Sequence, residues 1–186
     1  MTVVAEVLIG AKDLDPNVER SVSLSAAALG DLDGDGCADA VFGGQLRPTG
    51  EVSFGTKGRL YVVPGSPDGL RFDRAVRINL DSDAISRIAL LPATRQIAAT
   101  TRTSSRGALH VITLDRAFTT LTHKVVKSAV LGRQEHSQFG YALAADATTL
   151  AVGSPVAVID HTGVRGAVYL FSAKTPSGRV WRSPAA

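Results

Sequence analysis

The chain has 186 residues, 45% of them hydrophobic and 20% charged, so it is long enough to bury a core and is not composed like a disordered protein. Its net charge of +3 is spread along the chain, which argues against a nucleic-acid partner. A single cysteine excludes an internal disulfide, and no apolar run is long enough for a transmembrane helix, so we expect no membrane insertion.

Short apolar segments alternate with Gly, Pro, Asp, Ser and Thr along the whole chain, a pattern typical of an all-β protein. The clearest predicted strands are 3–9, 22–29, 40–42, 59–63, 76–80, 85–91, 96–100, 108–114, 124–131, 141–145, 150–152 and 167–171. Segment 21–30 is the best helix candidate, but it is short and leads directly into a loop of Asp and Gly, which favours a strand. Trp181 is predicted to lie on a terminal strand at a sheet edge.

An acidic loop follows the predicted strand 22–29. It places four carboxylates within nine residues: Asp31, Asp33, Asp35 and Asp39. Like charges this close repel one another unless a cation neutralises them, and alternate carboxylates in a glycine-bent loop suit a hard ion such as Ca2+. An EF-hand is excluded, because position 12 counted from Asp31 is Phe42 and not glutamate. A solvated Asp/Gly turn without metal is the alternative.

Two elements recur along the chain. A basic residue and a glycine precede an apolar strand in 57–63, 106–112 and 165–171. An apolar strand that ends in small residues precedes each copy, in 40–44, 96–100 and 150–155, with a lone further copy in 7–11. A period of roughly 50–60 residues holding about four strands is the size of a propeller blade.

Segment 139–144, Phe-Gly-Tyr-Ala-Leu-Ala, followed by 150–155, resembles an FG-GAP repeat, the blade of the integrin α-subunit propeller. The loop 31–39 followed by Phe42-Gly43-Gly44 resembles the calcium-bearing form of that repeat. The resemblance implies a partial β-propeller of about three four-stranded blades. Its repeats are expected at 21–70 with the calcium loop, 71–120 in a degenerate form, and 121–182, after a trailing strand of a preceding blade in 1–20.

The same resemblance implies that Ca2+ is bound by the four carboxylates Asp31, Asp33, Asp35 and Asp39 and by the backbone carbonyl of Cys37. The acidic turns at 81–83 and 145–149 lack further ligands and are expected to hold no ion. The implied function is a non-catalytic, adhesion-like module that binds a protein or glycan through its loops, outside the cell or at its surface. The alternative is the accessory propeller of a secreted hydrolase similar to a glycosylphosphatidylinositol-specific phospholipase D, with its catalytic domain outside this chain.

Catalytic patterns are missing from the sequence. The four histidines, at 110, 123, 136 and 161, have no partner at a metal-binding or nucleophile spacing. His110 occupies the position of Tyr61 and Tyr169 in the repeated strand, which indicates a structural role. We therefore expect no active site. Integrin-type propellers have seven blades, so three blades form an open arc, and we expect it to self-associate or to be completed by blades of a longer chain.

Overall fold

The computed structural model describes residues 11–14, 21–47, 57–80, 84–102, 107–127, 138–157, 166–172 and 179–181. The predicted strand 3–9, the acidic segment 81–83 and the histidines at 136 and 161 lie outside these ranges. Within them the chain is all-β, as predicted, and forms three antiparallel sheets of four strands each. The helical elements are short: α1 (Ala11–Leu14), η1 (Phe72–Arg74) and η2 (Pro92–Thr94).

In each sheet every strand pairs with the next strand in the sequence. Sheet A contains β1 (Ser21–Gly30), β2 (Asp39–Arg47), β3 (Lys57–Val63) and β4 (Val76–Asn79). Sheet B contains β5 (Ile85–Leu91), β6 (Gln96–Arg102), β7 (Gly107–Leu114) and β8 (Thr120–Lys127). Sheet C contains β9 (Ala142–Ala145), β10 (Thr149–Ser154), β11 (Ala167–Ser172) and β12 (Arg179–Trp181).

The predicted strands are confirmed where the structure describes them, including 21–30 as β1 and the edge strand with Trp181, which pairs with β11. Ala11, expected to end the lone strand motif near the N-terminus, instead begins α1. The first two repeats were expected to end at residues 70 and 120. Strand β4 lies wholly after residue 70, and β8 begins at residue 120 and continues beyond it. Each of these sheets is therefore completed by a strand that the repeat pattern had placed with the following repeat.

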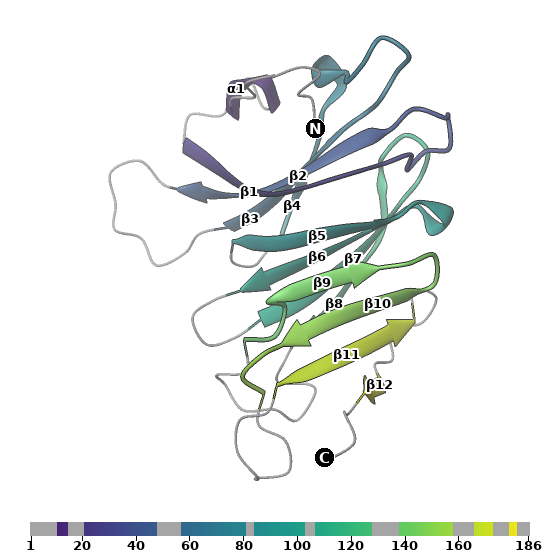
Figure 1. The fold of residues 1–186 in the computed structure, drawn as a ribbon. Coiled ribbons are helices and arrows are strands. Elements are labelled where there is room, and N and C mark those ends of the chain that lie inside the picture. The colour runs from purple at the N-terminus through teal and green to yellow at the C-terminus, as the bar shows by residue number, and fades with distance from the viewer. Residues whose placement is uncertain are drawn as a thin grey trace, which may run out of the picture.

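The three sheets are stacked, with sheet B between A and C (Figure 1). Side chains alternate between the two faces of a strand, so β7 supplies Ile112 to the core shared with sheet A, and Leu109 and Val111 to the core shared with sheet C. The first strands lie side by side along the stack, because β5 contacts both β1 and β9. The outer face of sheet A is covered by a third cluster that includes Leu14 of α1.

Small residues allow neighbouring sheets to approach closely. A Cβ atom at Gly43 of β2 would lie 2.7 Å from Ile85 of sheet B, and one at Gly107 of β7 would collide with the backbone carbonyl of Phe139. Phe139 is buried between sheets B and C and meets Tyr169 edge-on, with ring centroids 5.3 Å apart. Gly140, its neighbour, has φ of 90° and accepts a hydrogen bond from Thr100 Oγ1 at 2.9 Å. The Phe-Gly pair thus joins sheet C to sheet B.

Candidate metal centre

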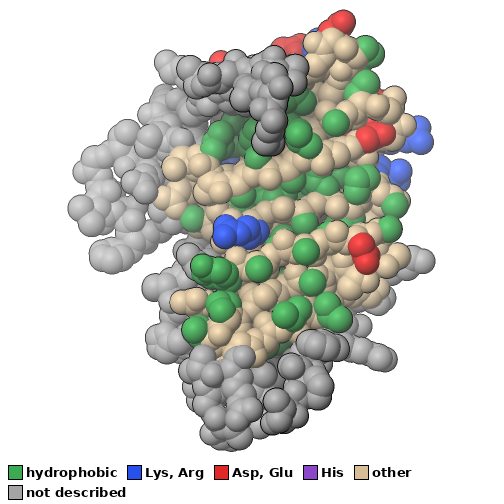
Figure 2. Space-filling view, in the orientation of Figure 1, with side chains coloured by type: hydrophobic (Ala, Val, Ile, Leu, Met, Phe, Trp, Pro, Cys, Tyr) green, Lys and Arg blue, Asp and Glu red, His purple; other side chains and the backbone are tan. Residues whose placement is uncertain are grey.

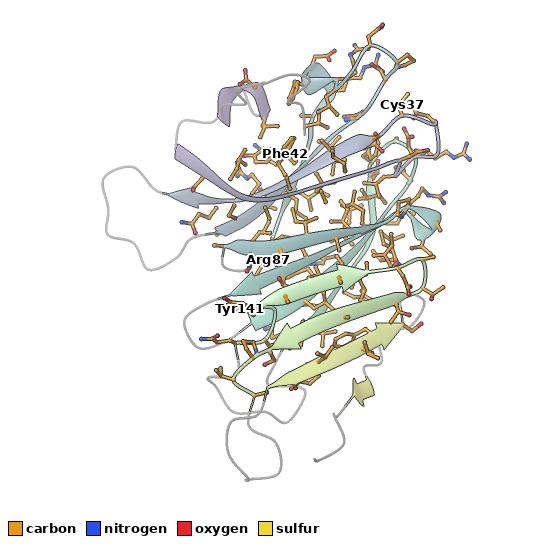
Figure 3. All side chains as sticks on the ribbon, in the orientation of Figure 1. Cys37, Phe42, Arg87 and Tyr141 are labelled. Atoms are coloured by element: carbon orange, nitrogen blue, oxygen red, sulfur yellow. The ribbon has the colours of Figure 1, made fainter. Side chains whose placement is uncertain are left out.

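The acidic loop connects β1 to β2 and closes an antiparallel hairpin in which Gly30 faces Asp39. Figure 3 shows Cys37 at the far end of this hairpin, away from Arg87 and Tyr141. Gly34 and Gly36 have φ of 82° and 90°, a region that side chains with a Cβ rarely adopt. These two glycines allow the chain to coil tightly enough for successive carboxylates to face the same point.

The Asp31 carboxylate organises the coil. Its Oδ1 accepts the backbone N–H of Gly34 at 2.7 Å, and its Oδ2 accepts that of Gly36 at 3.0 Å. Asp33 Oδ1 accepts the N–H of Asp35 at 3.0 Å, and Asp35 Oδ1 accepts that of Cys37 at 2.7 Å. The loop therefore satisfies much of its own backbone with its acidic side chains, as Asx turns do.

Asp39 is fully buried, unlike the other acids of the loop. Its Oδ2 accepts the N–H of Leu32 at 2.7 Å, and its Oδ1 accepts the N–H of Gly65, in the segment after β3, at 2.8 Å. A Cβ at position 65 would lie 2.5 Å from the Ala38 carbonyl oxygen, so only glycine allows this approach. Asp39 thus ties the two ends of the loop to each other and to the chain that follows β3.

Leu32 lies between two acidic residues but points into the protein. It is 1% exposed and belongs to the core shared by sheets A and B, together with Val62, Ile85 and Ile97. Asp31 and Asp33, on either side of it, are half-buried. The packing of Leu32 therefore holds the two flanking carboxylates at the surface in a fixed relation to the core.

Carboxylate oxygens of Asp31, Asp33 and Asp39 all lie within 4.8 Å of one another. Calcium binds oxygen at about 2.3–2.6 Å, so two oxygens that share one ion are separated by at most about 5 Å. The hard, anionic donors and their spacing both fit such an ion. Asp35, the fourth predicted carboxylate, is exposed and does not belong to this cluster, and the Cys37 thiol does not belong to it either.

The crowding of negative charge perturbs the loop. The pKa of Asp33 is raised, first by partial burial and then by repulsion from Asp39, Asp35 and Asp31. The pKa of the Cys37 thiol is also raised, first by desolvation and then by the nearby charge of Asp35, so the thiol is kept protonated. A bound cation would reverse the electrostatic part of both effects.

The corresponding turns of the other sheets are built differently. Sheet B has η2 there, which ends at Arg95 with φ of 50°. Sheet C has a short turn in which Asp146 Oδ1 accepts the N–H groups of Thr148 and Thr149, each at 2.7 Å, and these bonds lower the pKa of Asp146. Within the described ranges, the cluster in sheet A is the one group of three or more potential metal ligands.

Two histidines that the sequence did not connect are neighbours in the structure. His110 Nδ1 lies 2.9 Å from His123 Nε2. In the antiparallel pair of β7 and β8, Ile112 lies opposite His123, so His110, two residues before Ile112, is the diagonal neighbour of His123 on the same face. His110 is 2% exposed, and its Nε2 lies 3.3 Å from Thr101 Oγ1. Desolvation, followed by the charges of His123 and Lys127, lowers the pKa of His110 to about 4.

Sequence reasoning missed Leu32, Gly65 and the His110–His123 pair. Leu32 had a detectable signal, because it is an isolated apolar residue within a polar loop. Gly65 and the histidine pair had none, since each contact depends on the pairing of distant strands. His110, Tyr61 and Tyr169 occupy the same position in three corresponding strands, and all three are buried, which agrees with a structural role for His110.

Comparison with known proteins finds no family model and no curated protein that matches this chain. In the part of the chain that the structure describes, no helix is long and apolar enough to cross a membrane. The face with β1, β5 and β9 in front carries scattered hydrophobic groups and few charges (Figure 2).

Proposed function

We propose that this chain is a calcium-binding module and that Asp31, Asp33 and Asp39 hold the ion. The observation that carries the proposal is the convergence of these three carboxylates within 4.8 Å in a tight β-hairpin loop. Oxygen ligands of this charge and spacing favour a hard divalent cation over the softer metals, which prefer sulfur and imidazole. Asp35 and the Cys37 carbonyl, one on each side of Gly36, are proposed as the remaining ligands and would need the loop to tighten around the ion.

The module is proposed to be a partial β-propeller of FG-GAP-type blades. Three observations support this architecture: each sheet is a four-stranded antiparallel meander, the sheets stack face to face, and their first strands lie side by side. The Phe139-Gly140 pair supports it as well, because Phe139 fills the space between two consecutive sheets.

Calcium would act as a structural clasp. The ion would hold Asp31 and Asp33, which flank the core residue Leu32, against Asp39, which also binds Gly65. It would thereby fix the hairpin relative to the core between sheets A and B. We propose a non-catalytic, adhesion-like role outside the cell or at its surface, in which other loops contact a protein or glycan. Self-association or further blades would complete the open arc.

Thermal unfolding of the chelator-treated protein during calcium titration tests this proposal. Calcium should raise the Tm of the intact chain, because a ligand that binds only the folded state stabilises it. Asp33→Ala should remove the shift, whereas Asp68→Ala, which removes an exposed carboxylate outside the cluster, should retain it. The absence of a shift in the intact chain, or an equal shift in Asp33→Ala, would contradict the proposal.

A further inference from the structure

Three polar side chains form a hydrogen-bonded row across sheet B, from its interior to its outer strand. Thr101 Oγ1 of β6 lies 3.3 Å from His110 Nε2 of β7, and His110 Nδ1 lies 2.9 Å from His123 Nε2 of β8. Thr101 and His110 are 3% and 2% exposed, whereas His123 is exposed on the edge strand. The row therefore connects a buried ionisable group to one that is in contact with water.

The two imidazole rings point directly at each other. Their centroids are 5.2 Å apart, which exceeds the distance between the two facing nitrogens, 2.9 Å, by 2.3 Å. This difference is close to the two distances from ring centre to nitrogen, so both nitrogens lie near the line that joins the ring centres. A metal ion shared by the rings would need their lone pairs to converge beside that line. The geometry fits instead an N–H of one ring that is donated to the lone pair of the other.

This hydrogen bond limits the number of protons that the pair can hold. One ring has to keep an unprotonated nitrogen as the acceptor, so the bond is compatible with at most one positive charge. A second proton makes both facing nitrogens donors, brings two positive charges together, and charges His110 at a position that is closed to water. Protonation of both rings is therefore incompatible with the paired arrangement.

The groups around His110 differ in charge from one neighbouring element to the next. On β8, His123 and Lys127 both act on it as positive charges. On β6, Thr101 is an uncharged hydroxyl and Ala99 lies directly opposite His110. The β7 residues that follow on the same face belong to the apolar core shared with sheet A. The repulsion that a charged His110 meets from these elements comes from β8, and it is relieved when β8 moves away.

Strand β8 is anchored more firmly at its beginning than along its second half. The turn before it places Phe118, which is 5% exposed, in the core shared by sheets A and B. Along the strand the side chains are exposed, except that Val126 is partly buried against the core shared with sheet C. Segment 123–127 is paired with residues 108–112 of β7 and buries little apolar surface of its own. Segments of this kind open locally at a much lower cost than the whole protein unfolds.

We propose that the His110–His123 pair is an acid-sensitive latch, which holds segment 123–127 of β8 on sheet B and releases it when both rings are protonated. Release separates the two charged rings, carries Lys127 away and admits water to His110. It also leaves residues 108–112 of β7 as an unpaired strand edge, which is a surface on which another strand can pair. The latch does not include the acidic loop, so it does not depend on the proposed metal site.

The direction and size of the response follow from the two states of His110. In the paired state its pKa is lowered to about 4 from 6.5, first by burial and then by the charges of His123 and Lys127. In the released state His110 is in contact with water and regains its ordinary pKa. The paired state is therefore fully favoured above about pH 6.5 and loses this advantage as the pH falls. The ratio of released to paired β8 should rise about 20-fold between pH 7 and pH 5.

Amide hydrogen exchange of the intact chain, resolved by NMR at pH 7 and pH 5, tests the proposal. After correction for the intrinsic pH dependence of exchange, the protection of segment 123–127 should fall about 20-fold in acid. It should be lower than that of β6 at both pH values, because β8 opens without global unfolding. His123→Gln should give a clearly smaller fall, since its amide oxygen can accept a hydrogen bond from a charged His110. Lys124→Gln, an exposed neighbour on β8, is the matched control and should keep the full response.

Equal protection of segment 123–127 at pH 7 and pH 5 in the intact chain would overturn the proposal. So would a fall in His123→Gln as large as that of the intact chain, because the response would then not need the pair. Exchange in β8 as slow as in β6 would also overturn it, since β8 would then separate only on global unfolding. His110→Gln, if far-UV circular dichroism shows it to be folded, should lose the response entirely, and a retained response would contradict the latch.

Discussion

The negative charge of Asp33 has opposite effects on stability with and without a bound ion. Its carboxylate lies beside those of Asp31 and Asp39, and this repulsion costs stability when no cation is bound. We expect Asp33→Asn to raise the free energy of unfolding in chelator, by a few tenths of a kcal/mol up to about 1 kcal/mol, because the site is near the surface. In calcium the same variant should be less stable than the intact chain, because it has lost a ligand.

Urea unfolding in the two conditions measures this reversal. Asparagine keeps an oxygen that can accept the Asp35 N–H, so the loop hydrogen bond is retained and only the charge is removed. Asp68→Asn is the control and should change the free energy of unfolding by the same amount in calcium and in chelator. A variant that is destabilised equally with and without calcium would contradict the expectation.

His110 should make stability depend on pH in the acidic range. Its pKa in the folded protein is lowered to about 4 from 6.5, so the unfolded chain binds a proton at pH values where the folded protein does not. The stability is therefore complete above about pH 6.5 and is lost progressively as the pH falls to about 4. The loss amounts to about 3 kcal/mol over this window.

Denaturant unfolding between pH 4 and pH 7 measures the contribution of His110. His110→Gln keeps polar atoms next to Thr101 and His123 but does not titrate, so its stability should vary less with pH than that of the intact chain. Carboxylates that titrate in the same range contribute equally to both proteins and cancel in the comparison. Parallel pH profiles for the two proteins would show that His110 does not carry the dependence.

At the scale of residues, the sequence predicted where the acidic cluster lies more accurately than which carboxylates belong to it. The spacing of Asp31, Asp33 and Asp39 was informative because a glycine-bent loop brings alternate side chains together. Asp35 has the same spacing and also accepts a loop N–H, as the other three carboxylates do, but its own carboxylate stays outside the cluster. Which carboxylates converge depends on the exact dihedral angles of the loop, and the residue types alone do not determine them.

At the scale of elements, the second strands of sheets A and C offer a matched pair of glycines. Gly43→Ala should destabilise the protein by about 1–3 kcal/mol, because its methyl group would overlap Ile85 and Ile88 in a packed core. Gly153→Ala should cost much less, because its nearest neighbour is the exposed Ala142, at 3.1 Å. Thermal and urea unfolding of the two variants measures the difference, and equal costs would contradict the packing described for the two faces.

The loop element should be coupled to the core through Leu32. Leu32→Ala removes a fully buried leucine and should lower the free energy of unfolding by about 2–5 kcal/mol. It should also weaken calcium binding, because Leu32 fixes the positions of Asp31 and Asp33. Isothermal titration with calcium measures this effect, with Leu121→Ala as the control, since that leucine is 59% exposed on β8. Unchanged calcium affinity in folded Leu32→Ala would show that the loop is positioned without it.

The strands themselves were largely predictable, because short apolar segments bounded by turn residues carry the required information locally. Their ends were less so. β8 begins at Thr120, four residues before its predicted start, in a stretch whose side chains are almost all exposed. An edge strand of this kind is held by backbone pairing with β7, so it needs no apolar pattern of its own. Its assignment to sheet B, like that of β4 to sheet A, followed from pairing and not from the repeat period.

At the scale of the whole molecule, sheet B should be the most protected part of the fold. It is covered on both faces, and Ile97 and Ala98, adjacent in β6, are both fully buried in opposite cores. Amide protons of β6 and β7 should therefore exchange most slowly with deuterium, and those of the edge strands β8 and β12 much faster. Hydrogen exchange followed by mass spectrometry of peptides measures this order. Slower exchange in sheet C than in β6 would contradict it.

The stacking order of the sheets has a limited basis in sequence. Repeats at a regular spacing indicate similar units placed side by side, and the three sheets agree with that expectation. Which face of each sheet meets its neighbour depends on alternation within each strand and on irregularities such as the shift of register between Leu24 and Ala26 in β1. Such a shift exchanges inward and outward residues, and the sequence of β1 gives no sign of it.

The position of Leu32 between Asp31 and Asp33 also constrains the length of the loop. Deleting either Asp31 or Leu32 would place an aspartate at the position where Leu32 now enters the core. If Asp31 were deleted, Leu32 would also turn toward the surface. Gly34, Asp35 and Gly36, by contrast, are exposed and contribute nothing to the core clusters. Insertions after Asp33 should therefore leave the core intact but break the coil that brings Asp31 and Asp33 next to Asp39, whereas insertions before Asp33 should disturb the core itself.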